Sequence, residues 1–229
     1  MRLIAIGDIH GELDHLVRLL ERVKPTAEDK VIFLGDYVDR GSKIPETVSF
    51  LINFKKEFPN TVFIRGNHEV MMMDGEKDDG VFLNLWLHNG GDSTMKQYAQ
   101  TEGLFESHRF FFMDTKTKHR EFHEGTHYFF SHAGWDSYRS LESQWVKTDP
   151  HYIIWEREHL SGLGRKLAED NWEGVAVFGH TPLKFPLNLP QMVGIDTGAC
   201  FGNYLTAVVL GKERIFYTSE VEDGENLPV

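Results

Sequence analysis

The chain has 229 residues, a length that fits one α/β domain. Its formal net charge is -11, from 24 basic and 35 acidic residues, which argues against a broad basic face for nucleic acid. The single cysteine, Cys200, excludes an intrachain disulfide and suits a reducing cytoplasm. A strand expected at the start of the chain leaves no room for a signal peptide, and no apolar run reaches the roughly 18 residues of a membrane span. We therefore expect a cytoplasmic protein without nucleic-acid, membrane or obligate protein partners.

The first part of the chain predicts strands that alternate with helices. Apolar runs at residues 3–6, 31–34 and 61–64 are typical of buried strands. Residues 13–23 and 44–54 carry apolar side chains at helical spacing, which predicts two amphipathic helices. Strands that alternate with helices indicate βαβ units.

The rest of the chain is less regular at first and then returns to strands. Residues 69–122 are expected to be mostly helical, and the segment 86–91, WLHNGG, is typical of a helix end with a glycine cap. The acidic tail at residues 220–225 is expected to fray. Without a linker or repeat, we expect a single domain over residues 1–229. The later strands are expected at residues 128–130, 175–178, 192–195, 205–210 and 214–217.

Polar side chains follow the first three predicted strands, at turns flanked by glycine. Residues 7–11 read GDIHG, residues 35–41 read GDYVDRG and residues 65–69 read RGNHE. Ligands gather at the carboxyl ends of strands in α/β folds, and glycine lets the backbone turn sharply there. The Asp, His and Asn side chains of these turns therefore indicate one metal site built from separate loops.

In this order the three motifs resemble those of the phosphoprotein-phosphatase branch of the calcineurin-like binuclear metallophosphoesterases, in a bacterial form. Residues 132–134, HAG, and 179–181, GHT, also match the pattern, so the resemblance runs from residue 3 to residue 210. It implies an α/β (α+β, four-layer) fold of two packed mixed β-sheets flanked by helices, with metals at the sheet edge. The strand and helix pattern alone does not distinguish this fold from a doubly wound sheet.

The resemblance also implies two divalent metal ions. The six implied ligands are Asp8, His10, Asp36, Asn67, His132 and His180. The first three would hold one ion, and Asp36 would bridge to a second ion that the last three complete. Oxygen and imidazole ligands without thiolate suit Mn²⁺, Fe or Zn²⁺, and we expect Mn²⁺. An Asp after a strand is more often a turn residue when taken singly, but five motifs in the family's order argue against chance.

Direct hydrolysis of a phosphate ester is the implied reaction. A water shared by the two ions would attack phosphorus in line, without a phosphoenzyme. His68, beside Asn67, would protonate the leaving alkoxide, and Asp39 would orient its imidazole. Arg40, Asn67 and Arg157 would bind the phosphate, Arg157 by a weaker local resemblance. The simpler alternatives are a salt bridge from Asp39 to Arg40 and a surface helix arginine at Arg157.

Three functions stay open at this point. The first is a metal-dependent phosphomonoester hydrolase, a serine/threonine protein phosphatase that acts on phosphorylated proteins or peptides. The second is a symmetrical diadenosine tetraphosphate hydrolase; relatives with that activity replace the acidic residue at Asp39 and end the third motif in Asp, whereas this chain has Glu69. The third is a non-enzymatic scaffold around the metal site. The chain is shorter than eukaryotic members, which suggests a broad substrate range that includes phosphotyrosine.

Residues 123–127, HEGTH, match the zinc-protease pattern H-E-x-x-H. That motif needs a helix, on which the two histidines share a face. Here Gly125 interrupts it and a β-like aromatic run follows, so we expect an exposed loop instead.

Overall fold

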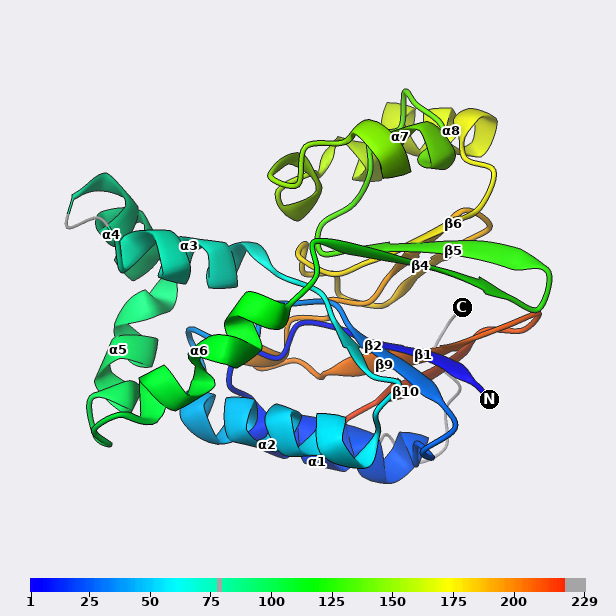
Figure 1. Ribbon diagram of the computed structural model, residues 1–229. Coiled ribbons are helices and arrows are strands. Elements are labelled where there is room, and N and C mark those ends of the chain that lie inside the picture. Colours follow the sequence, from blue (N-terminus) through cyan, green and yellow to red (C-terminus); the bar gives the residue numbers. More distant parts are fainter. Residues whose placement is uncertain (78–79, 221–229) are drawn as a thin grey trace.

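The computed structural model describes residues 1–77 and 80–220. Within them two five-stranded sheets pack face to face, with helices outside (Figure 1). The first sheet has the order β10-β9-β1-β2-β3, in which β1, β2 and β3 are parallel to one another and β9 is antiparallel to both of its neighbours, β1 and β10. Its strands are β1 (Leu3–Ile6), β2 (Lys30–Phe33), β3 (Val62–Phe63), β9 (Thr206–Leu210) and β10 (Ile215–Thr218).

The second sheet is also mixed. Its order is β4-β5-β6-β8-β7, in which β5, β6 and β8 are parallel and the two edge strands are antiparallel to their neighbours. The strands are β4 (Lys118–His123), β5 (Thr126–Ser131), β6 (Val175–Phe178), β7 (Leu187–Leu189) and β8 (Met192–Gly194).

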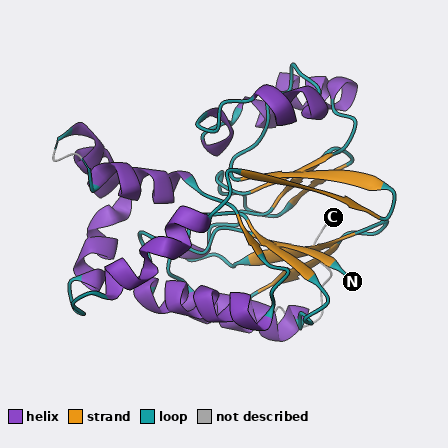
Figure 2. Cartoon of the chain, viewed as in Figure 1, coloured by secondary structure: helices purple, strands orange, loops and turns teal. Residues whose placement is uncertain are grey.

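Helices form the two outer layers and one end of the molecule (Figure 2). The outer face of the first sheet is covered by α1 (Leu13–Val23) and α2 (Ile44–Glu57), and that of the second by α7 (Leu141–Lys147) and α8 (Gly162–Asn171). The remaining helices lie at one end of the sheets: α3 (Asn67–Gly75), α4 (Val81–Trp86), a π-helical turn (Leu87–Gly91), α5 (Asp92–Tyr98) and α6 (Leu104–Asp114). Short 3₁₀ turns occur at Tyr152–Ile154, Glu158–Leu160 and Ala199–Phe201.

The central strands are apolar along their whole length because both of their faces are buried. In β1, Leu3 and Ala5 pack into the core between the two sheets, whereas Ile4 and Ile6 pack into the core under α1 and α2. Such two-sided burial is typical of parallel strands covered by helices. The two-sheet fold expected from the sequence is confirmed, and the doubly wound alternative is excluded.

Most predicted elements are found within a residue or two, but the middle of the chain needs corrections. Residues 118–122, in the segment expected to be mostly helical, belong instead to β4, which pairs with β5 along its whole length. In the HEGTH stretch, His123 ends β4, Glu124 and Gly125 form the hairpin turn at positive φ, and Thr126 and His127 begin β5. Gly90 does interrupt the helix, at φ 101°, but the chain continues directly into α5.

Three expectations concern the chain as a whole. Beyond Glu220 the acidic tail lies outside the described residues. The single domain over residues 1–229 stays a prediction. In the part of the chain that the structure describes, no helix is long and apolar enough to cross a membrane.

Candidate metal centre and active site

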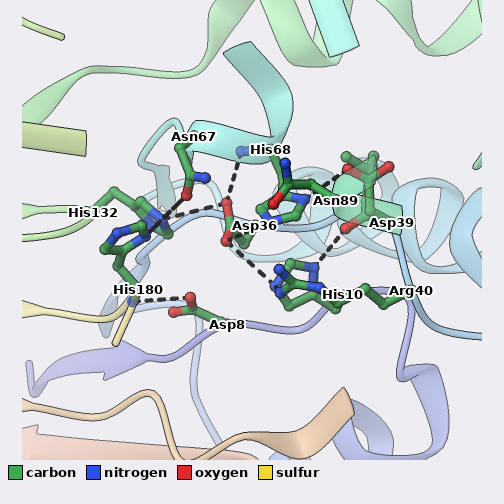
Figure 3. A network of polar contacts seen from close by, with 12 residues as sticks. Asp8, His10, Asp36, Asp39, Arg40, Asn67, His68, Asn89, His132 and His180 are labelled. Atoms are coloured by element: carbon green, nitrogen blue, oxygen red, sulfur yellow. Dashed lines mark hydrogen bonds and ion pairs between the residues drawn. The ribbon is translucent and has the colours of Figure 1, made fainter. Parts of the chain in front are cut away.

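The loops after the parallel strands of both sheets meet at one edge of the molecule, where they bring seven polar side chains together (Figure 3). The loops after β1 and β2 and the start of α3 come from the first sheet, and the loops after β5 and β6 come from the second. All seven side chains are buried: Asp8, His10, Asp36, Asn67, His68, His132 and His180. The edge predicted from the strand-end motifs is therefore formed.

Asp36 lies at the centre of this group (Figure 3). Its Oδ2 is 3.3 Å from Nε2 of His10, and its Oδ1 is 3.4 Å from Nε2 of His132. Two clusters with potential ligand atoms within 4.8 Å of one another share this carboxylate, one with His10 and His68 and one with His132 and His180. One carboxylate between two sets of donors is the arrangement that a bridging ligand requires.

Backbone carbonyls fix the orientation of two of the histidines. Nδ1 of His10 is 2.7 Å from the oxygen of Val38, and Nδ1 of His132 is 2.8 Å from the oxygen of Leu34. Because a carbonyl can only accept, each Nδ1 carries the hydrogen and donates it. In this orientation Nε2 of each ring faces Asp36, and when the ring is neutral its lone pair is available to a metal ion, as in metal-binding histidines.

Asn67 completes the second cluster. Its Oδ1 is 2.9 Å from Nε2 of His132 and 3.0 Å from Nδ1 of His180, and these two ring nitrogens are 3.2 Å apart. Three potential ligand atoms thus converge on one point beside Asp36.

The buried carboxyl groups at this edge have strongly shifted pKa values. Burial and the neighbouring charge of Asp196 raise the pKa of Asp8 well above its ordinary value. Burial would also raise the pKa of Asp36, but nearby histidines, His132 first, hold it well below. Oδ1 of Asp8 is one of several buried polar atoms in the described residues that have no hydrogen-bond partner. Crowded carboxylates, converging imidazole nitrogens and this unpartnered oxygen together fit a centre of divalent cations.

Asp8 lies at the same edge, in the loop after β1 (Figure 3). It belongs to neither of the two clusters found among the described residues, and its Oδ2 accepts a hydrogen bond from the backbone N–H of His180, at 2.9 Å. Asp8 therefore ties the loop after β1 to the loop after β6, with Oδ1 still unpartnered beside the centre.

His68 and Asp39 form a buried pair next to the first cluster. Nδ1 of His68 is 2.7 Å from Oδ2 of Asp39, and since the carboxylate accepts, Nδ1 is the donor. Nε2 of His68 then faces Asp36, at 3.9 Å from its Oδ2. Burial lowers the pKa of His68, although the charges of Asp36 and Asp39 act in the opposite direction. In the described part of the chain the ion-pair partner of Asp39 is His68, and no ion pair joins it to Arg40.

Two exposed arginines lie near the centre. Nη1 of Arg40 is 2.7 Å from Nε2 of His10, and its guanidinium stacks over the ring of Phe201 at 5.2 Å. Arg157 precedes the 3₁₀ turn at Glu158–Leu160, and its charge contributes, after burial and His132, to a lowered pKa of His180. Both positive charges therefore act on histidines of this edge.

Comparison with known proteins agrees with this geometry. The calcineurin-like phosphoesterase family matches residues 1–209. The chain belongs to this family. It is therefore a phosphoesterase, a hydrolase of a family that uses a dinuclear metal centre, and its His and Asp clusters could hold one. Serine/threonine-protein phosphatase 1 of Salmonella typhimurium is 33% identical over 211 residues, which cover 88% of each protein.

Solved structures share the fold at lower identity. A candidate diadenosine tetraphosphatase has a TM-score of 0.64 at 21% identity and covers 95% of this chain and 93% of its own. A cold-active protein-tyrosine phosphatase of a psychrophilic Shewanella species has a TM-score of 0.65 at 18% identity, with 96% and 80% covered. A protein serine/threonine phosphatase from Saccharomyces cerevisiae has a TM-score of 0.65 at 16% identity, with 100% and 82% covered.

In this phosphoesterase a buried glutamate holds the loop of Asp36 in place. Glu69 is fully buried and accepts hydrogen bonds from four backbone N–H groups. The donors are Gly66 at 2.8 Å, Asp36 at 2.9 Å, Tyr37 at 2.7 Å and Val38 at 3.3 Å. Burial, and then the charge of Asp36, raises the pKa of Glu69 to about 7. Glu69 thus fastens the loop after β2 to the start of α3.

Glu69→Gln should lower the free energy of unfolding by about 1–3 kcal/mol, because an amide has one acceptor oxygen for four buried donors. Chemical denaturation of the metal-free protein measures this loss. Glu142→Gln is the control, since Glu142 pairs with Arg120 at the surface, at 3.0 Å, and should change stability by less than about 1 kcal/mol. Equal stability of the Glu69 variant and the parent would contradict this support role.

Sequence reasoning missed three residues of this region. Asp196 follows β8, is buried, and contributes to the raised pKa of Asp8; its position after a strand was the available signal. Trp86 and Thr94 both donate hydrogen bonds to Asp39. Trp86 begins the WLHNGG segment, for which the motifs offered no chemical role, and Thr94 lies beyond that segment without a signal of its own.

Proposed function

We propose that this phosphoesterase hydrolyses phosphomonoesters and acts as a serine/threonine protein phosphatase on phosphorylated proteins or peptides. The observation that carries the proposal is the buried Asp39–His68 pair beside Asp36. A serine or threonine alkoxide is a poor leaving group, so its departure needs a positioned proton donor. The 33% identical Salmonella typhimurium relative, a serine/threonine-protein phosphatase by name, supports the same substrate class.

In this proposal two divalent ions would be held by the ligand set implied by the motifs. The ligands would be Asp8, His10, Asp36, Asn67, His132 and His180, and Asp36, which belongs to both clusters, would serve both ions. When bound, the ions supply Lewis acidity and a water of lowered pKa for in-line attack on phosphorus. The oxygen and nitrogen donors suit Mn²⁺, with Fe and Zn²⁺ as the alternatives.

The chain's own residues bind the phosphate and move the proton. Arg40 and Arg157 would clamp the phosphoryl oxygens, on which charge spreads in the transition state, and the amide of Asn67 would contact the same group. As water forms its bond to phosphorus and the ester bond breaks, Nε2 of His68 gives its proton to the leaving oxygen. Asp39 keeps the ring oriented through Nδ1 and stabilises the imidazolium before the transfer.

The alternative is a diadenosine tetraphosphate hydrolase. The candidate diadenosine tetraphosphatase favours it through closely matched chain lengths, but at 21% identity the likeness concerns the fold alone. Asp39 and Glu69 weigh against it, because the resemblance associates that activity with a non-acidic residue in place of Asp39 and with Asp in place of Glu69. In this chain Asp39 pairs with His68, and Glu69 binds the loop of Asp36. A cytoplasmic location and the lack of an obligate partner stay predictions.

The two functions are separated by kcat/KM on a phosphothreonine peptide and on diadenosine tetraphosphate, measured side by side with the same Mn²⁺-loaded enzyme. We expect the peptide to be preferred by at least about 100-fold, since a site that protonates an alkoxide gives no advantage to a phosphate leaving group. A phosphotyrosine peptide in the same series measures the breadth of the site. A preference for the dinucleotide would overturn the protein-phosphatase assignment and leave the metal site standing.

A further inference from the structure

We propose that the segment from Trp86 to Thr94, which joins α4 to α5, is a positioning element for proton transfer: Trp86 and Thr94 fix Asp39 and thereby aim His68 at the leaving group. The inference rests on the proposed role of His68 as proton donor. It gives the WLHNGG segment a role that its sequence did not reveal.

The side chain of Asp39 has its acceptor sites taken by three donors. Nε1 of Trp86 lies 3.0 Å from both carboxylate oxygens, and Oγ1 of Thr94 donates to Oδ1 at 2.6 Å. The third donor is Nδ1 of His68, at 2.7 Å from Oδ2. Asp39 is 0% exposed, so these groups replace water entirely. A buried carboxylate that loses one of three donors can rotate toward the others, and the imidazole bound to it would turn as well.

The backbone at Asp39 depends on the same segment. Asp39 and Arg40 both have φ near 70°, a conformation that non-glycine residues rarely adopt and that the surroundings must stabilise. Oγ1 of Thr94 accepts the N–H of Asp39 at 2.9 Å, and the carbonyl of Gly90 accepts the N–H of Arg40 at 3.4 Å. The hydroxyl of Thr94 is thus acceptor and donor to one residue, a combination that Ser can reproduce and Val cannot.

The two glycines of the segment allow this close packing. A Cβ on Gly91 would lie 2.5–2.6 Å from atoms of the Trp86 indole, so only glycine lets the ring reach Asp39 in this position. At Gly90, where φ is 101°, a Cβ would lie 2.9 Å from Cγ of Arg40. Trp86, the glycine pair and Thr94 therefore act together on the turn that carries Asp39 and the proposed phosphate clamp.

A positioning role has a distinct kinetic signature. Protonation matters for the alkoxide of phosphothreonine and matters little for 4-nitrophenolate, which leaves as a stable anion. A misaimed His68 should therefore slow hydrolysis of the peptide selectively. KM should stay close to that of the parent, because Trp86 and Thr94 bond to Asp39, whereas the backbone of Arg40 is held by the carbonyl of Gly90, which these variants keep.

The test measures kcat and KM of Mn²⁺-loaded Trp86→Phe and Thr94→Val on a phosphothreonine peptide and on 4-nitrophenyl phosphate. We expect kcat on the peptide to fall by about 10–100-fold and kcat on 4-nitrophenyl phosphate by less than about 3-fold, with both KM values unchanged. Thr94→Ser should keep at least about half of the parent activity. In the metal-free protein, the downfield Nδ1–H proton resonance of His68 should shift or broaden in the first two variants and stay in the third.

Two control variants each remove the same kind of hydrogen-bond donor, an indole N–H or a threonine hydroxyl, that does not bind Asp39. Trp172→Phe deletes an indole N–H that donates to the carbonyl of Asp136 at 3.2 Å, and Thr47→Val deletes a buried hydroxyl that donates to the carbonyl of Lys43 at 2.7 Å. Neither should change the ratio of the two kcat values. Equal losses on both substrates in the Trp86 and Thr94 variants would reduce the segment to a structural support and overturn the proposal.

His68→Asn in the same assay distinguishes a failure of the positioning role from a failure of proton donation by His68. If this variant loses the peptide reaction selectively but Trp86→Phe and Thr94→Val do not, the positioning role is wrong and the proposed function stands. If His68→Asn itself affects both substrates equally, proton donation by His68 is wrong, and the inference fails with it.

Discussion

Replacing His68 by asparagine should lower kcat on a phosphothreonine peptide by about 10²–10⁴-fold. Asparagine can still donate a hydrogen bond to Asp39, but it cannot deliver a proton to the leaving oxygen. The lone pairs of His10 and His132 are fixed by the carbonyls of Val38 and Leu34 and do not depend on His68. Steady-state kinetics together with metal analysis of the same sample should therefore show lost turnover with metal content retained.

His127→Asn is the matched control for this variant. His127 lies at the start of β5, exposed, in the stretch that matches H-E-x-x-H. Its replacement should leave kcat within about 2-fold of the parent, because surface substitutions away from a site have small effects. Full activity of His68→Asn would contradict proton donation, whereas lost activity with retained metal would exclude a purely non-enzymatic scaffold.

Asp36→Asn should have the largest effect of any single change at this edge. Asp36 is the only carboxylate shared by the two clusters found among the described residues. Its loss should release at least one of the two ions after dialysis and lower activity by about 10³-fold or more, since Lewis-acid stabilisation amounts to several kcal/mol. Metal stoichiometry by mass spectrometry and turnover on 4-nitrophenyl phosphate measure the two effects separately.

Asp29→Asn controls for the loss of a buried carboxylate as such. Asp29 is 3% exposed and accepts hydrogen bonds from Arg2 through Oδ1 and Oδ2. These hydrogen bonds do not involve the loops that carry the proposed metal ligands. Its variant should lose about 1.5–3 kcal/mol of stability and keep both ions, because charged hydrogen bonds are lost and no ligand is touched. If Asp36→Asn bound two ions as tightly as the parent, the bridging role would be wrong.

The first half of the fold could be predicted from the sequence because the apolar residues there recur at the spacing of the faces that are buried in the structure. The helix expected at residues 13–23 is α1 at the same bounds, since its apolar spacing is also the spacing of its buried face. The polar turns at Asp8, Asp36 and Asn67 could be placed together because parallel strands end at the same edge of a sheet. The structure also shows how the rings of His10 and His132 are oriented by backbone carbonyls, which the sequence motifs do not specify.

The parts that sequence could not supply depend on contacts between distant segments. Strand β4, KHREFH, lies at a sheet edge, and none of its residues is fully buried. Its sequence therefore lacks the alternation of apolar and polar residues that predicts a strand, and its pairing with β5 stabilises it. Trp86 and Thr94 reach Asp39 across 47 and 55 residues of chain. Nothing local in either residue type indicates such a partner, and only the packing of α4 and α5 against the loop after β2 brings them together.

The proposed function rests on a two-metal centre bridged by Asp36 at the buried edge of the two sheets. Anomalous X-ray diffraction from crystals of the Mn²⁺-loaded protein tests for this centre. We predict two manganese peaks, one on each side of Asp36, with Nε2 of His10 at the first and Nε2 of His132 at the second. A single peak, or peaks that Asp36 does not join, would contradict the two-metal site and the mechanism built on it.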